Sequence, residues 1–160
     1  MVVSDTSPIA NLAAIGQLEL LRQLYGEVAI PQAVFRELSA MWSHEQQGEA
    51  LPGTPWIQTC RVTNQRLAGS LLLQLDPGEA EAIALAIETQ SALLLMDERR
   101  GRRIAGGFGL KCIGVLGLLV EAKRKGLIAA VRPHLDALVT RAGFRIARGL
   151  YARVLTEVGE

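Results

Sequence analysis

Short apolar runs alternate with stretches of helical periodicity along the chain. The runs lie at residues 1–3, 28–30 and 92–96, and each is followed by a segment whose apolar residues recur at helical spacing. A run that is apolar throughout and has its polar residues at its carboxyl end is typical of a buried strand in a parallel sheet. The alternation therefore predicts an α/β fold around a mostly parallel sheet.

The turn and helix signals divide the chain into more elements of this kind. Gly16 is expected to divide the helical stretch at 9–24, and Pro31 to open the next helix. Further expected elements are an exposed loop at 43–54, strands at 56–62, 111–115 and 144–146, and helices at 79–89, 99–106, 116–125, 127–139 and 148–158. No repeat or linker interrupts this order, so a single domain over residues 1–160 is predicted.

Composition places the chain among soluble globular proteins. Hydrophobic residues make up 49% and charged residues 21%, while aromatic residues are only 4%, so the core is expected to be aliphatic. No apolar run is long enough to cross a bilayer, and the first residues do not read as a signal peptide. Cys60 and Cys112 stand alone and are expected to be reduced thiols. A cytoplasmic protein with no membrane association is predicted.

Four acids fall where a parallel sheet gathers its ligands. Asp5 follows the first apolar run and Asp97 follows the run at 92–96, so both are expected at the carboxyl ends of strands. Glu37 and Glu79 lie on the predicted helices and could complete a ring of carboxylates. Such a cluster is stabilised by a hard divalent cation, which relieves the repulsion between like charges. Each acid alone also has a purely structural interpretation, as a helix cap or as a solvated helix residue.

Charge is distributed unevenly along the chain. Residues 1–96 carry four Lys or Arg and ten Asp or Glu, whereas residues 97–160 carry thirteen and six. This asymmetry can mark a surface for a polyanion beside an acidic site. The basic residues closest to an expected site acid are Arg99, Arg100, Arg102 and Arg103. A solvated helix face or ion pairs with an acidic partner would also account for them.

Three segments of the sequence resemble the PIN-domain family, which includes the VapC-type ribonuclease toxins. The segments are VVSDTSPIANLAAIGQLELL, IPQAVFREL and LDPGEAEAIALAIETQSALLLMDERRGRRIA. The likeness is closest to a branch of PIN-like proteins with a Gly-Glu pair at the helix start and a basic Asp-Glu-Arg-Arg stretch after the fourth strand. The resemblance implies a three-layer α/β/α sandwich.

The resemblance also implies a function and the residues that perform it. The implied activity is a metal-dependent endoribonuclease that hydrolyses RNA phosphodiesters, the toxin of a toxin–antitoxin pair, with Mg²⁺ or Mn²⁺ as cofactor. Its partners would be RNA, a second copy in a homodimer and a cognate antitoxin. The implied catalytic and metal residues are Asp5, Glu37, Glu79 and Asp97, and the implied substrate contacts are Thr6, Ser7, Arg99, Arg100 and Arg103.

Two points of the site stay open at the level of sequence. Many relatives have Asp where this chain has Glu79, and Glu81 is a rival because the two side chains point about 200° apart on a helix. Glu79 is preferred because the first helical turn lies nearest the strand ends. Glu98, next to Asp97, could contribute through a metal-bound water.

Other functions remain possible for such a chain. The main alternative is a nucleic-acid-binding or regulatory module whose metal site is vestigial; it would bind RNA with a strong salt dependence and show no turnover. A phosphatase-like hydrolase is a third possibility, which the sequence disfavours because Ser7 stands where that class usually needs a second Asp. The leucines of the carboxyl-terminal helices, namely Leu135, Leu138, Leu150 and Leu155, could supply the dimer interface.

Overall fold

A five-stranded parallel sheet lies at the centre of the protein. The computed structural model describes residues 1–42 and 53–160, and the strand order is β3-β2-β1-β4-β5. The strands are β1 (Val2–Ser4), β2 (Val28–Pro31), β3 (Ile57–Cys60), β4 (Leu93–Leu95) and β5 (Cys112–Ile113). The predicted α/β fold with a parallel sheet is confirmed, and most of the predicted 43–54 loop lies outside the described residues.

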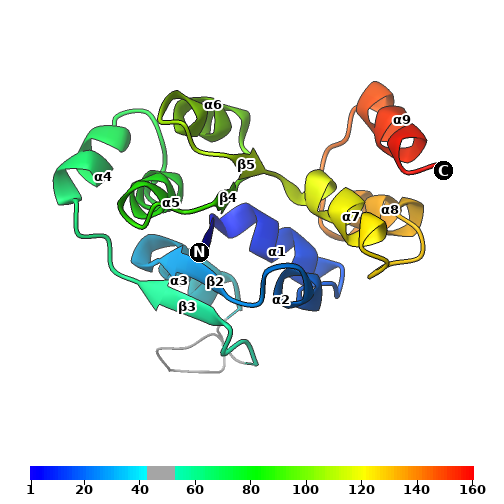
Figure 1. Cartoon of the computed structure of the whole chain (residues 1–160), viewed down its shortest axis with the longest axis horizontal. Helices are drawn as coiled ribbons and strands as arrows, with labels where there is room; N and C mark the ends of the chain where they lie inside the picture. The colour runs from blue at the N-terminus through cyan, green and yellow to red at the C-terminus, as the bar shows by residue number, and fades with distance from the viewer. Residues whose placement is uncertain (43–52) are drawn as a thin grey trace.

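Helices cover both faces of the sheet (Figure 1). One face carries α4 (Gln65–Leu71), α5 (Pro77–Glu88) and α6 (Arg99–Gly107). The other carries α1 (Thr6–Ala14), α2 (Glu19–Tyr25), α7 (Val115–Arg124), α8 (Arg132–Arg141) and α9 (Arg148–Glu157), and α3 (Gln32–Trp42) packs against α5 and α1. This arrangement confirms the three-layer α/β/α sandwich.

Alternation along each strand builds two separate aliphatic cores. Val3, Ala29 and Leu94 face α5, whereas Ile30 and Leu95 face α1 and α7, and all five are nearly inaccessible to solvent. Side chains that alternate along a strand point to opposite faces of its sheet, so a strand covered by helices on both sides is apolar throughout. Burial on both faces is the reason that these strands read as uninterrupted apolar runs.

The order of the strands reverses beside β1, the first strand of the chain. β1 pairs with β2 on one side and with β4 on the other, and Ser4 stands opposite Leu95. The chain therefore builds outward in one direction from β1 to β3 and then returns to add β4 and β5. Such a switch point leaves a crevice at the carboxyl ends of the two central strands, which is where open parallel sheets bind ligands.

Two of the predicted elements differ from the structure near the carboxyl terminus. No strand forms at 144–146, because the chain turns back on α8: Gly143 adopts a φ of 65° and the Phe144 N–H donates to the Leu138 carbonyl at 2.9 Å. A glycine in the left-handed region commonly ends a helix in this way. The helix expected at 127–139 begins only at Arg132, and Pro133 occupies its first turn.

The carboxyl-terminal leucines invoked for a dimer interface are part of the core. Leu135 and Leu138 are fully buried, Leu155 is 5% exposed and Leu150 packs against the same cluster. The apolar surface of Leu135, Leu138 and Leu155 is thus covered within the chain, and Leu150 is partly covered. Among the described residues, no helix combines the length and the apolar character needed to cross a bilayer.

Candidate active site

Asp5 leaves β1 directly at the crevice between the two central strands. Its N–H donates to the Leu95 carbonyl of β4 at 2.9 Å, and its extended backbone places it at the N-cap of α1. The carboxylate does not cap that helix with a side-chain hydrogen bond. The side chain is therefore available to the crevice, although Asp5 as a whole is only 5% exposed.

Asp5 lines a pocket that is rich in carboxylates. The pocket has a volume of about 380 Å³. Its acids are Asp5, Glu37, Asp76, Glu79 and Glu98, and its neutral polar side chains are Thr6, Ser7 and Asn11. Oxygen donors of this kind suit a hard divalent cation such as Mg²⁺ or Mn²⁺.

The environment of Asp5 disfavours its negative charge. The pKa of Asp5 is raised from 3.8 to about 7. Burial is the largest cause and the charges of Asp76, Glu79 and Glu37 add to it, while a hydrogen bond from the Thr6 N–H opposes the shift. A carboxylate with a strongly raised pKa in a pocket is a common feature of functional sites. A bound cation would offset both the burial and the repulsion.

Glu79 and Asp76 form a capping box at the start of α5. The Glu79 N–H donates to Asp76 Oδ1 at 2.8 Å, and the Asp76 N–H donates to Glu79 Oε2 at 3.3 Å. Burial raises the pKa of Glu79, and the charge of Asp76 is the next cause. Asp76 was not among the acids predicted for the site. The Asp-x-x-Glu capping pattern was visible in the sequence and would have brought it to the same helix start as Glu79.

Glu81 points to a different neighbour. Its Oε2 accepts a hydrogen bond from the Ala33 N–H at 2.8 Å, in the first turn of α3, and its Oε1 lies 3.9 Å from Arg36. Residues two apart on a helix project in nearly opposite directions. Glu79 consequently lines the pocket and Glu81 secures α3, which is the arrangement preferred from the sequence.

Glu37 lies on α3 and accepts hydrogen bonds from two other helices. Thr6 donates its hydroxyl to Glu37 Oε2, and the Gly78 N–H donates to Oε1 at 3.1 Å. Thr6 is in the first turn of α1 and Gly78 in the first turn of α5. Glu37 thus connects the segments that carry Asp5 and Glu79.

Asp97 stands beside the pocket and is held by its own set of donors. Its Oδ1 accepts from the Val115 N–H at 2.8 Å and its Oδ2 accepts from Ser7 Oγ at 3.4 Å. Asn11 Nδ2 donates to the same Ser7 oxygen at 3.0 Å. Burial raises the pKa of Asp97, and hydrogen bonds from Val115 and Ser7 oppose that shift. Ser7 and Asn11, which do line the pocket, connect Asp97 to it.

The acidic side chains of the site do not converge on a single point. Among residues 1–42 and 53–160, no three His, Cys, Asp or Glu side chains are grouped as metal ligands. One carboxylate oxygen each of Glu37, Glu79 and Asp97 accepts a hydrogen bond from a backbone amide. Asp5, Glu37 and Glu79 line the pocket, and Asp97 lies beside it. The chemistry of the donors fits a divalent cation, and closing the ligand set requires side-chain rotation or bridging water.

An unpaired arginine cluster begins immediately after Glu98. Arg99, Arg100, Arg102 and Arg103 are exposed on α6, and none of them lies within ion-pair distance of a carboxylate in the described part of the chain. The charge of Arg102 nevertheless acts on Asp97 and opposes the rise of its pKa. Gly101 and Ala105, on the opposite side of the helix, are buried. Unpaired guanidinium groups beside an acidic pocket are suited to binding phosphates.

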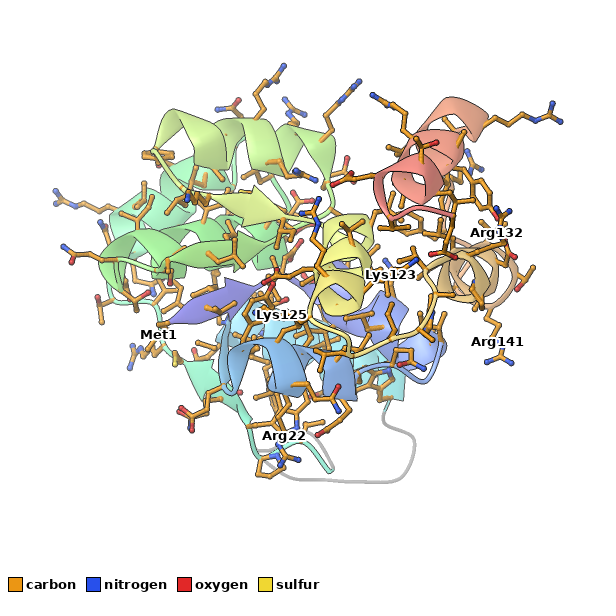
Figure 2. The ribbon with its side chains drawn as sticks, turned by 45° about the vertical axis from the view of Figure 1, so that its right-hand side comes forward. Met1, Arg22, Lys123, Lys125, Arg132 and Arg141 are labelled. Atoms are coloured by element: carbon orange, nitrogen blue, oxygen red, sulfur yellow. The ribbon has the colours of Figure 1, made fainter. Side chains whose placement is uncertain are left out.

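The lysines at the carboxyl end of α7 differ from this cluster because each pairs with an acid. Lys123 contacts Glu160 at 2.9 Å and Lys125 contacts Glu121 at 3.2 Å. Figure 2 shows both lysines at the end of α7, with Arg132 and Arg141 on α8 beyond them. Much of the positive charge of residues 97–160 is therefore either paired or located away from α6.

Comparison with known proteins agrees with this geometry. A family model described as a PIN domain matches the chain over residues 1–160. No curated protein matches it at a significant level. The match over the whole length, together with the parallel sheet and the acids at its switch point, shows that this chain belongs to the PIN-domain family, whose members are generally nucleases.

Proposed function

We propose that the protein is a divalent-metal-dependent endoribonuclease that hydrolyses phosphodiester bonds in RNA. The observation that carries the proposal is the buried Asp5 carboxylate, surrounded by other acids in a pocket at the switch point of the sheet. Burying like charges together is costly unless a cation accompanies them. Since members of the PIN family are generally nucleases, the substrate expected at this pocket is a nucleic acid.

The residues of the pocket have distinct parts in this proposal. Asp5 and Glu79 would hold the Mg²⁺ or Mn²⁺ ion, with Asp97 contributing directly or through water. Glu37, the fourth acid expected for the site, borders the same pocket. When bound, the ion would supply an activated water and would neutralise charge on the scissile phosphate. Ser7 donates its hydroxyl hydrogen to Asp97 and so keeps that carboxylate oriented.

The arginines of α6 supply the expected contacts to the substrate. Arg99 and Arg100 follow Glu98, which lines the pocket, so phosphates on either side of a bound scissile group would lie within reach of them. Arg103 extends the same basic helix. Guanidinium groups bind phosphate oxygens bidentately and remain charged at every physiological pH.

Cleavage of labelled RNA by the full chain tests the proposal. We expect cleavage in Mn²⁺ or Mg²⁺, loss of cleavage in EDTA, and loss of cleavage with Asp5→Asn. Binding of the RNA should persist in that variant, because the arginines are unchanged. Undiminished cleavage by Asp5→Asn in the presence of EDTA would show that the activity does not arise from this pocket.

One observation favours the alternative of an RNA-binding module with a vestigial metal site. One oxygen of Glu37 and one oxygen of Asp97 accept hydrogen bonds from backbone amides, so these two acids already have structural roles. A vestigial site predicts RNA binding that weakens steeply with salt, without turnover in any divalent ion. The cleavage experiment, repeated with a filter-binding assay across salt concentrations, separates the two functions.

The toxin role and the partners are further parts of the proposal. A toxin of a toxin–antitoxin pair should arrest growth when expressed alone, and Asp5→Asn should remove the arrest. A cognate antitoxin and a homodimer are expected from the family resemblance. Leu135 and Leu138 cannot form the homodimer interface, because they are buried in the chain's own core.

A further inference from the structure

We propose that Glu37 is a positioning residue, which holds Asp5 and Glu79 in place through hydrogen bonds and does not itself bind the cation. The inference rests on the proposed function, since it assigns a role within the same site. It starts from the two hydrogen bonds that Glu37 accepts, one from a donor on α1 and one from a donor on α5.

Each donor to Glu37 is a chain neighbour of a pocket acid. Thr6, which donates its hydroxyl, directly follows Asp5, and Gly78, which donates its N–H at 3.1 Å, directly precedes Glu79. Hydrogen bonds to a carboxylate are charge-assisted and stronger than those between neutral groups. One side chain on α3 therefore binds the residues that adjoin Asp5 and Glu79 in the chain.

Gly78 is the position that permits this contact. A Cβ atom built at residue 78 would lie 2.7 Å from both carboxylate oxygens of Glu37. Gly78 lies in the first turn of a regular helix, where the backbone conformation does not require glycine. The absence of a side chain there instead allows Glu37 to approach closely. Any larger residue would push the carboxylate away from the N-terminus of α5.

Helices α3 and α5 are held together independently of Glu37. Glu81 of α5 accepts a hydrogen bond from the Ala33 N–H of α3 at 2.8 Å, so the two helices exchange carboxylate contacts in both directions. Buried Val34 and Leu38 of α3 also pack in the core. Substitution of Glu37 is accordingly expected to leave the fold intact.

Calorimetric titration of the metal-free chain with Mn²⁺ distinguishes positioning from ligation. In Glu37→Gln, the amide oxygen can accept from Gly78 and the amide nitrogen can donate to Thr6, so both contacts persist without the negative charge. Positioning predicts that the Mn²⁺ affinity of Glu37→Gln stays within about threefold of wild type, whereas Glu37→Ala loses about 10–100-fold. If Glu37→Gln binds Mn²⁺ as weakly as Glu37→Ala, Glu37 is a ligand and the proposal is wrong.

A substitution that keeps every carboxylate gives a second test. Gly78→Ala should displace Glu37 and weaken Mn²⁺ binding by about tenfold, although no acid has been removed. Gly69→Ala is the matched control, because Gly69 also lies in a helix and a Cβ there would meet no atom within 4 Å. Wild-type affinity in a folded Gly78→Ala variant would overturn the proposal.

Hydrogen exchange at the Gly78 amide tests the positioning role without any metal. The amide should be protected in the wild type and in Glu37→Gln, and it should exchange faster in Glu37→Ala. Equal exchange in all three proteins would contradict the inference. Failure of the proposed function has a different signature, namely wild-type Mn²⁺ binding that is absent or that Asp5→Asn leaves unchanged.

Discussion

The N–H of Val115 donates to Asp97 Oδ1 at 2.8 Å, so the acid that follows β4 also secures the first turn of α7. The N-cap position of α7 is Gly114, which has no side chain to do this. A carboxylate is favourable at the positive end of a helix. The same oxygen that anchors the helix belongs to an acid of the proposed metal site.

Substitution of Asp97 should separate these two roles. Asp97→Asn keeps an oxygen for Val115, whereas Asp97→Ala leaves that N–H without a partner. We expect Asp97→Ala to be about 1 kcal/mol less stable than Asp97→Asn in urea unfolding, while both variants lose RNA cleavage. Equal stability of the two variants would mean that the contact does not stabilise α7.

The raised pKa of Asp5 predicts how stability depends on pH in the absence of metal. The folded protein keeps a proton on Asp5 up to a pKa of about 7, whereas the unfolded chain releases it near 3.8. The free energy of unfolding should therefore fall as pH rises through this interval. Asp5→Asn removes the effect, so its Tm should exceed that of the wild type at about pH 8 and approach it at about pH 4.

Thermal unfolding in EDTA between about pH 4 and pH 8 measures the Tm difference between the wild type and Asp5→Asn. Added Mn²⁺ should raise the Tm of the wild type but not that of Asp5→Asn. A Tm difference that does not change with pH would show that Asp5 does not titrate in this interval.

Gly114 should not tolerate a side chain. A Cβ there would lie 2.5 Å from Asp97 Oδ1 and 3.2 Å from a guanidinium nitrogen of Arg102. Gly114→Ala should lower both stability and cleavage, because Asp97 must move. Gly106→Ala is the control: it lies in α6 with no atom within 4 Å of its added Cβ, and it should be neutral or stabilising by up to about 1 kcal/mol. Similar Tm and cleavage for both variants would contradict the expectation.

Glu79 and Glu81 should give opposite results. Glu79→Gln should abolish RNA cleavage, because its carboxylate lines the pocket. Glu81→Ala should retain cleavage and lose about 1 kcal/mol of stability, since the Ala33 N–H of α3 loses its acceptor. Cleavage rates and urea unfolding of the two variants test the assignment, and loss of cleavage in Glu81→Ala with wild-type stability would reverse it.

Arginines of α6 should contribute to RNA binding through charge. Replacing Arg99 and Arg100 with Ala should raise the Kd for single-stranded RNA and lower the slope of log Kd against log salt by about 1.4, which is about 0.7 for each lost phosphate contact. Arg132 and Arg141, which lie on α8 away from α6 (Figure 2), provide a control with the same change in charge. Equal effects of the two double variants would indicate that the binding surface is not centred on α6.

Several features of the site follow from short stretches of sequence. Apolar runs that end in Asp5 and Asp97 predict strands with acids at their carboxyl ends, and hydrophobic alternation is a local property that needs no knowledge of distant residues. The spacing of Glu79 and Glu81 shows that one alone can face a given side of the helix. Local sequence patterns therefore predicted the sheet, the two acids at the strand ends and the basic helix that follows Asp97.

The partner of each carboxylate was decided by tertiary packing. Glu37 meets Gly78, which is 41 residues away in the chain, and Asp97 meets Val115 and Ser7, so these contacts exist only because α1, α3, α5 and α7 begin at the same edge of the sheet. Helix starts carry unsatisfied N–H groups, and a carboxylate beside one will bind it. Sequence by itself determined that Asp5 and Asp97 follow strands at that edge, because strand patterning is local. The packing of the helices decided which other acids join them and which amides and hydroxyls each carboxylate binds.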